Sequence, residues 1–136
     1  MKTLKKITLF VFLAVALSVS CSKSDNNNTP VYPTDCALSL AGIYTGSDFC
    51  SGSSPNAYTC TVTANTPTNI TFSNLYGYPV TATLDCSTNK ITIPTQSFTG
   101  NISIGGSGTY TGNRIIINWN GTSLGIPLSC STTYTR

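Results

Sequence analysis

The chain of 136 residues carries seven Lys and Arg against four Asp, has no His, and has a formal net charge of +3. Three of the basic residues, Lys2, Lys5 and Lys6, lie at the very start, so the remaining chain is close to neutral. A neutral chain offers no electrostatic basis for binding nucleic acid. The absence of His excludes the common Ser-His and Cys-His nucleophile pairs and any His metal ligand, so we expect no catalytic residue, metal or cofactor.

The N-terminus has the pattern of an export signal. The three lysines precede an uncharged apolar run from Ile7 to Leu17, which is followed by Ser18-Val19-Ser20 and then Cys21. This pattern is typical of a secretory signal peptide, and the run is too short to span a bilayer permanently. A cysteine directly after the cut resembles the bacterial lipoprotein signal. The resemblance implies that residues 1–20 are removed, that the Cys21 thiol receives a diacylglyceryl group, and that the new α-amine receives a further acyl chain such as palmitate.

Residues 21–35 are predicted to be a disordered, lipidated tether. They include three consecutive Asn and two Pro and have almost nothing to bury. The polar residues after Cys21 are similar to the surface-export signals of some outer-membrane lipoproteins. We therefore expect a mature chain anchored through Cys21 in the bacterial outer membrane, on its periplasmic face or at the cell surface.

Residues 36–136 are predicted to form one small all-β domain. Apolar residues alternate with Thr, Ser or Asn with period two, and turn residues separate the apolar stretches. Eight strands and no helix are expected, at residues 40–49, 57–64, 69–75, 80–86, 90–94, 101–111, 114–120 and 126–134. The short links leave little room for crossovers, so the pattern favours an up-and-down antiparallel β-barrel that closes the first strand onto the last. The run from Gly105 to Gly108 indicates a bulge or bend within a strand, because it lacks the Lys and the helix of a phosphate loop.

Gly42-Ile43-Tyr44 is similar to the start of a lipocalin-like (calycin) barrel, whose first strand carries Gly-x-Trp. In this chain Tyr44 stands in the place of the Trp. The resemblance covers the whole domain in strand order and implies a barrel that binds a small apolar ligand. The family's last-strand Arg covers the first-strand aromatic residue, and in this chain that role could only fall to Arg136.

Six cysteines in an exported chain indicate disulfides, and the alternating topology restricts the pairs. Cys50, Cys60 and Cys130 are expected at one rim of the barrel, and Cys36 and Cys86 at the other. A strand of about seven residues spans roughly 23 Å, whereas bridged Cα atoms lie within about 7 Å, so pairs across the rims are excluded. We predict Cys36–Cys86 and Cys50–Cys130, with Cys60 as a buried thiol. Cys50–Cys60 remains an alternative, because these residues are symmetric about a predicted turn.

Aromatic residues are the candidates for binding. Tyr76-Gly77-Tyr78-Pro79 is predicted to form a turn, where exposed rings would stack on a sugar or anchor a partner. The plainer interpretation is that one Tyr caps the rim while Gly and Pro form the turn. Trp119 shares its face with Ile115 and Ile117, which favours a place in the core. The candidate binding residues are Tyr44, Tyr76, Tyr78 and Trp119.

Catalysis is not expected. A carboxylate pair for glycoside hydrolysis would require facing acids, but Asp48 and Asp85 are predicted at opposite rims, as surface or turn residues. Two binding functions remain. The first is a carrier of a small apolar ligand with a partly empty interior, which the small inward residues Gly106, Gly108 and Ala82 would permit. The second is a surface module, with a filled core and rim loops that contact a glycan or protein or serve a structural role.

Overall fold

The computed structural model describes residues 35–51 and 55–136. The described residues belong to one compact unit. The predicted signal peptide, the lipidation site Cys21 and the predicted tether, except its last residue Asp35, lie outside the described residues. Within the described ranges, no helix combines the length and the hydropathy needed to cross a bilayer.

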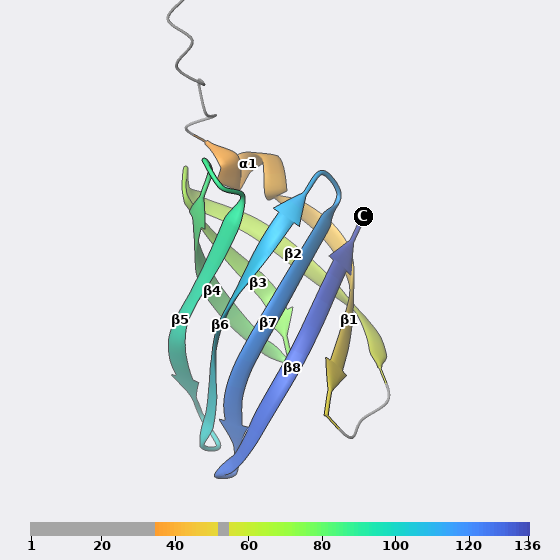
Figure 1. The fold of residues 1–136 in the computed structure, drawn as a ribbon, viewed down its shortest axis with the longest axis vertical. Helices are drawn as coiled ribbons and strands as arrows, with labels where there is room; N and C mark the ends of the chain where they lie inside the picture. Colours follow the sequence, from red (N-terminus) through yellow and green to blue (C-terminus); the bar gives the residue numbers. More distant parts are fainter. Residues whose placement is uncertain (1–34, 52–54) are drawn as a thin grey trace, which may run out of the picture. The chain divides into compact units, whose positions relative to one another are not determined.

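Eight antiparallel strands form a closed barrel in which each strand pairs with its neighbours in sequence and β1 pairs with β8 (Figure 1). The elements are α1 (Cys36–Leu40), β1 (Gly42–Cys50), β2 (Asn56–Thr66), β3 (Asn69–Leu75), β4 (Tyr78–Asp85), β5 (Lys90–Phe98), β6 (Ile102–Thr111), β7 (Arg114–Ser123) and β8 (Ile126–Thr135). The β1–β8 ladder runs from the Thr45–Thr135 pair to the Cys50–Cys130 pair. The predicted up-and-down barrel is therefore confirmed.

The one-turn helix α1 is a feature that the sequence interpretation missed. Asp35 is its N-cap, because its side chain accepts a hydrogen bond of 3.1 Å from the Leu38 backbone N–H. A helix of five residues is too short to show a 3.6-residue period, so no helical signal was visible. Strand β5 is also longer than predicted. A register shift between Ile93 and Gln96 lets its pairing with β6 continue to Phe98.

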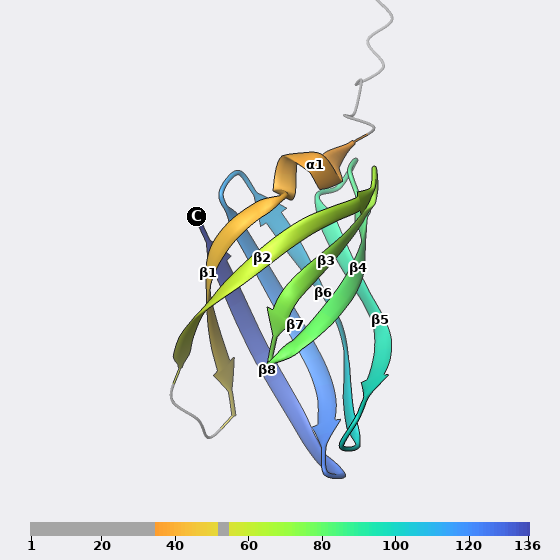
Figure 2. The same cartoon turned by 180° about the vertical axis from the view of Figure 1, so that it is seen from behind.

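The two ends of the barrel differ. Helix α1 lies across the end that also holds the β2–β3, β4–β5 and β6–β7 turns, and we call this the covered end (Figures 1 and 2). The opposite end, with the β1–β2, β3–β4, β5–β6 and β7–β8 connections, is the far end. Inward side chains from all eight strands, together with Leu40 of α1, form one apolar core. Its largest fully buried members are Trp119, Tyr44, Tyr134, Phe72, Leu40, Ile70, Leu75, Ile91, Ile104, Ile115, Ile117 and Val62.

The glycines of β6 serve close packing of strands. A Cβ atom on Gly106 would lie 2.3 Å from the carbonyl oxygen of Asn118, and one on Gly108 would lie 2.2 Å from that of Ile116. These positions therefore let β6 approach the β7 backbone and do not leave space for a ligand. The register of β6 against β7 is unbroken from Ser103 to Thr111, whereas its register against β5 shifts opposite Gly105, so the irregularity expected at the Gly105–Gly108 run lies in the β5–β6 ladder.

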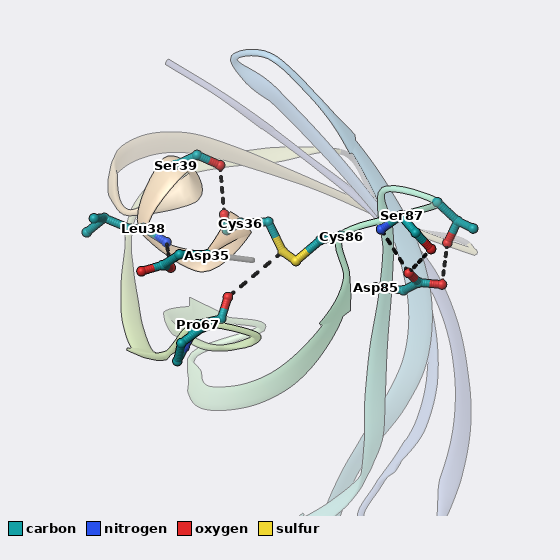
Figure 3. Close-up of a disulfide and its surroundings, with 9 residues drawn as sticks. Asp35, Cys36, Leu38, Ser39, Pro67, Asp85, Cys86 and Ser87 are labelled. Atoms are coloured by element: carbon teal, nitrogen blue, oxygen red, sulfur yellow. Dashed lines mark hydrogen bonds between the residues drawn. A yellow bond between two sulfur atoms is a disulfide. The ribbon is translucent and has the colours of Figure 1, made fainter. Parts of the chain in front are cut away.

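Both predicted disulfides are present. Cys36–Cys86 ties α1 to the chain that follows β4, with its Cα atoms 5.6 Å apart (Figure 3). Cys50–Cys130 joins β1 to β8, with its Cα atoms 4.1 Å apart. Cys60 is a buried free thiol, as predicted, so the alternative Cys50–Cys60 pair was wrong. The bridged residues are separated by 50 and 80 positions, and loop closure of that length stabilises the fold by about 4 kcal/mol per bridge in the chain-entropy model.

Candidate functional site

Tyr44 lies in the covered end, apart from the other aromatic candidates. It is 1% exposed, and its hydroxyl donates a hydrogen bond of 2.9 Å to the Leu40 carbonyl oxygen. The guanidinium carbon of Arg136 lies 5.0 Å from the centroid of the Tyr44 ring. Arg136 also donates from Nη1 to the Ala41 carbonyl oxygen and from Nη2 to that of Ser39, at 2.9 and 2.8 Å. Arg136 therefore covers the first-strand aromatic residue, as the lipocalin resemblance implied. Tyr44 is one of the side chains that fill the covered end of the barrel.

Tyr76 and Trp119 meet at the far end, with ring centroids 5.2 Å apart. The β3–β4 turn consists of Tyr76 and Gly77 alone, at φ values of 55° and 85°, which corrects the predicted four-residue turn. Two consecutive left-handed residues form the tight hairpin turn that suits the twist of paired strands. Tyr78 instead begins β4 and packs on Phe98, with centroids 4.9 Å apart. The far end thus presents Tyr76 over the buried Trp119.

A polar cluster extends from Trp119 across the inner face of the barrel. Tyr58 donates a hydrogen bond of 2.7 Å to Asp48 Oδ1, and the Thr132 hydroxyl donates to the same oxygen. Trp119 Nε1 donates to Thr132 Oγ1 at 3.0 Å. Asp48, Tyr58, Thr132 and Trp119 come from β1, β2, β8 and β7, respectively. We call Asp48, Tyr58, Thr132 and Tyr134 the Asp48 cluster.

Tyr134 completes the cluster and packs against Tyr58. Its hydroxyl donates to the Asn74 carbonyl oxygen at 2.9 Å and lies 3.2 Å from the Tyr58 hydroxyl oxygen. Its ring stacks on Phe72 with centroids 5.3 Å apart and meets Tyr58 edge to face at 6.1 Å. A Cβ atom on Gly46 would lie 2.7 Å from both tyrosine rings. The absence of a side chain at Gly46 therefore makes room for this pair.

Burial keeps the hydroxyl groups of the cluster protonated. It raises the pKa of Tyr58 and that of Tyr134 well above their ordinary value, and it is the largest cause in both cases. Burial also raises the pKa of the neighbouring Cys60 thiol, against hydrogen bonds from Asn74 and Ser73 that lower it. At neutral pH these groups are neutral, so Tyr58 acts as a hydrogen-bond donor toward Asp48.

Asp48 is the one charged residue of the described chain at the far end. The other five, Asp35, Asp85, Lys90, Arg114 and Arg136, all lie at the covered end. Lys23 and Asp25, the remaining charges of the expected mature chain, lie outside the described residues. The described far end therefore has a local negative charge with no counter-ion nearby.

The prediction that Asp48 and Asp85 lie at opposite rims is confirmed, but their shared interpretation as surface or turn residues holds for Asp85 alone. Asp85 accepts hydrogen bonds from Ser87 and Thr88 of its own turn. Asp48 instead faces inward in phase with Tyr44 and Cys50, both of which are buried. That period-two register was visible in the sequence and would have revealed the inward carboxylate.

Several hollows around the described residues lie over the outer face of the barrel. One of them, of about 430 Å³, lies over β1, β8 and β7, and Phe49 on its border is 61% exposed. Another, of about 370 Å³, lies over β5, β6 and β7. These hollows are lined mainly by Ser, Thr and Asn side chains and do not reach the Asp48 cluster.

Comparison of the sequence with protein-family models and with curated proteins finds no match. Solved structures with a similar fold include redesigned and de novo designed β-barrels. EF1p2_mFAP2b bound to DFHBI has a TM-score of 0.57 and 13% identity, over 76% of this chain and 98% of the other. The redesigned β-barrel mFAP1 bound to DFHBI has a TM-score of 0.55 and 16% identity, over 75% and 99%. Likeness at this level of identity establishes the closed barrel fold and nothing about a shared function.

Proposed function

We propose that this chain is an exported lipoprotein, held at the bacterial outer membrane by acyl groups on Cys21, whose barrel binds a small ligand at its far end without catalysing a reaction. The N-terminal pattern of three lysines, an apolar run and small residues before Cys21 supports the anchor. The difference between the two barrel ends supports the binding site.

That difference is the observation on which the binding site depends. At the covered end, α1 and Arg136 close the barrel over buried apolar side chains. At the far end, a hydrogen-bonded carboxylate lies inside the barrel next to aromatic rings. Apolar walls with a few convergent polar groups are characteristic of small-molecule sites, and small eight-stranded barrels either fill completely or hold one ligand at one end. The filled covered end favours a small ligand seated near the mouth over a long apolar one.

The single Trp of the chain provides the test, because Trp119 lies in the proposed site. Titration of the full-length protein with small aromatic compounds should change Trp119 emission in a saturable way. Amide NMR shifts should then cluster around Asp48, Tyr58 and Tyr76 and not around Tyr44. Shifts confined to the outer face, or none for any compound, would refute a ligand site at the far end.

The anchor requires its own experiment. Growth with an alkyne-labelled fatty acid should label the protein and direct it to the outer-membrane fraction, and Cys21→Ser should abolish both. A fully soluble wild-type protein with an unmodified N-terminus would contradict the proposal.

A surface interaction module is the second candidate, and the β7–β8 hairpin tip favours it. Leu124 and Ile126 are 75% and 64% exposed there, and Leu124 adopts a φ of 53°, which bulky residues rarely do. Asn is the residue preferred before Gly125 in such a turn. Leu124→Asn should therefore stabilise the domain by roughly 0.5–1 kcal/mol and still abolish binding of a partner that contacts this tip. Unchanged partner binding would exclude the tip.

A further inference from the structure

The acceptor capacity of Asp48 is only partly used. Tyr58 and Thr132 both donate to Oδ1, and Oδ2 receives no hydrogen bond from any described residue. Asp48 is half-buried, whereas Thr132 is fully buried. The carboxylate therefore has one oxygen held in place by the barrel and one oxygen available for a further donor.

The surroundings would suit a positively charged donor. Three of the groups nearest to the carboxylate, Tyr58, Thr132 and Trp119, are neutral, and no basic residue of the described chain lies at this end. A charge withdrawn from water in this way is costly unless it is paired. The ring of Tyr76, which is 36% exposed, lies against Trp119 at the mouth. Aromatic faces attract cations, and they also accept apolar parts of a ligand.

We propose that the far end of the barrel is a site for a small organic ammonium ion, whose N–H group pairs with Asp48 Oδ2 while its apolar part contacts Tyr76 and Trp119. This inference rests on the proposed ligand site and specifies the class of ligand. Pairing with a bound ammonium neutralises a carboxylate that the described chain itself leaves without a counter-ion. Thr132 and Tyr58 hold the carboxylate in position, because the Thr132 hydroxyl also accepts from Trp119 Nε1 and the Tyr58 ring packs edge to face against Tyr134.

The test compares two probes of the same shape, 2-phenylethylammonium and the neutral 2-phenylethanol, with 3-phenylpropanoate as an anionic third. Binding to the full-length protein is measured by calorimetry and by Trp119 emission. The cation should bind at least about tenfold more tightly than the alcohol, the difference expected for a charge-assisted hydrogen bond over a neutral one, and the anion should not bind.

Asp48→Asn is the decisive variant, because the amide oxygen can still accept from Tyr58 and Thr132. It should weaken the cation about tenfold and the alcohol by a smaller factor, because only the cation loses a charged partner. The matched control is Asp85→Asn at the covered end, which should alter neither affinity. Tyr76→Asn suits the left-handed turn position and removes only the ring, so it should weaken the cation roughly threefold in a folded protein.

The outcomes separate the two proposals. If both probes bind at the far end with equal affinity and Asp48→Asn changes neither, the ammonium inference is wrong and the ligand site stands. If neither probe alters Trp119 emission or the far-end amide shifts, the ammonium inference is refuted, and the ligand site is refuted as well when the other small aromatic compounds also give no change. If Asp48→Asn proves unfolded by circular dichroism, Tyr76→Asn and the comparison of charged and neutral probes on the wild type decide the matter.

Discussion

The guanidinium of Arg136 stacks on the ring of Tyr44, with the guanidinium carbon 5.0 Å from the ring centroid. The same side chain donates to two carbonyl oxygens of the α1 segment, those of Ser39 and Ala41. The residue after β8 therefore holds both the helix that covers the barrel and the aromatic residue beneath it.

Arg136→Ala should lower the free energy of unfolding by about 1–3 kcal/mol, because it removes these two hydrogen bonds and the stacking contact. Urea denaturation followed by Trp119 fluorescence measures the change. Arg114→Ala is the matched control, since Arg114 is an exposed Arg at the same end, and it should stay within about 0.5 kcal/mol of wild type. Equal effects of the two substitutions would contradict a specific role of Arg136.

Gly46→Ala should destabilise the domain by about 1–3 kcal/mol, because the new methyl group would overlap the rings of Tyr58 and Tyr134. Thermal unfolding by circular dichroism is a suitable measurement. Ser47→Ala, on the next residue and the outer face, should be nearly neutral. A Gly46→Ala protein as stable as wild type would show that the tyrosine pair has room to move.

Thr132→Val should cost about 1–3 kcal/mol, because it leaves the buried Trp119 Nε1 without its acceptor and Asp48 without one donor. The emission maximum of Trp119 should shift, since the polar partner of its indole is lost. Thr133→Val, whose side chain points to the outer face, should leave both stability and emission close to wild type.

The pKa of Asp85 should be about 2 in the folded protein, because hydrogen bonds from Ser87 and Thr88 stabilise its carboxylate. A lowered folded-state pKa means that the contribution of Asp85 to stability is present above about pH 4 and is lost as the pH falls toward 2. Carboxyl ¹³C NMR titration measures the midpoint directly. Ser87→Ala should raise it, and an ordinary midpoint in wild type would show that these turn hydrogen bonds do not form in solution.

One thiol per chain should react with a thiol reagent after denaturation of the membrane-extracted protein without reductant. That thiol is Cys60, which is fully buried in the folded barrel and should not react there. Its raised pKa further reduces its reactivity. Cys21 should not contribute, because acylation would block its sulfur. Two reactive thiols per chain would argue against acylation of Cys21.

Period-two patterning predicted the strands well, because one face of each strand is buried in the core and the other is exposed to solvent. It also supported the disulfide prediction, since alternating strands place Cys36 with Cys86 and Cys50 with Cys130 at common ends. The pattern failed for two short features. Helix α1 is too short to show a helical period, and the β3–β4 hairpin turn depends on the left-handed φ of Tyr76.

The residues of the proposed binding site were harder to predict than the fold. Tyr76 and Trp119 were named from their residue types, but their contact depends on barrel closure and strand tilt, which a linear pattern does not contain. The Asp48 cluster joins residues 84 positions apart in sequence, from Asp48 to Thr132. Only the inward register of Asp48 was readable beforehand, and its partners required the three-dimensional structure.

The Cys50–Cys130 bridge also determines how the domain would bear mechanical load. Tension applied between Cys36 and the C-terminus passes along β1 to Cys50 and through the sulfur atoms to Cys130, so the strands from β2 to β7 lie within a covalent loop that the pull bypasses. A barrel tethered on its N-terminal side should therefore keep these strands shielded when an attached partner pulls on the end of β8. Reduction of both disulfides should sharply increase the contour length released in a single-molecule stretching experiment.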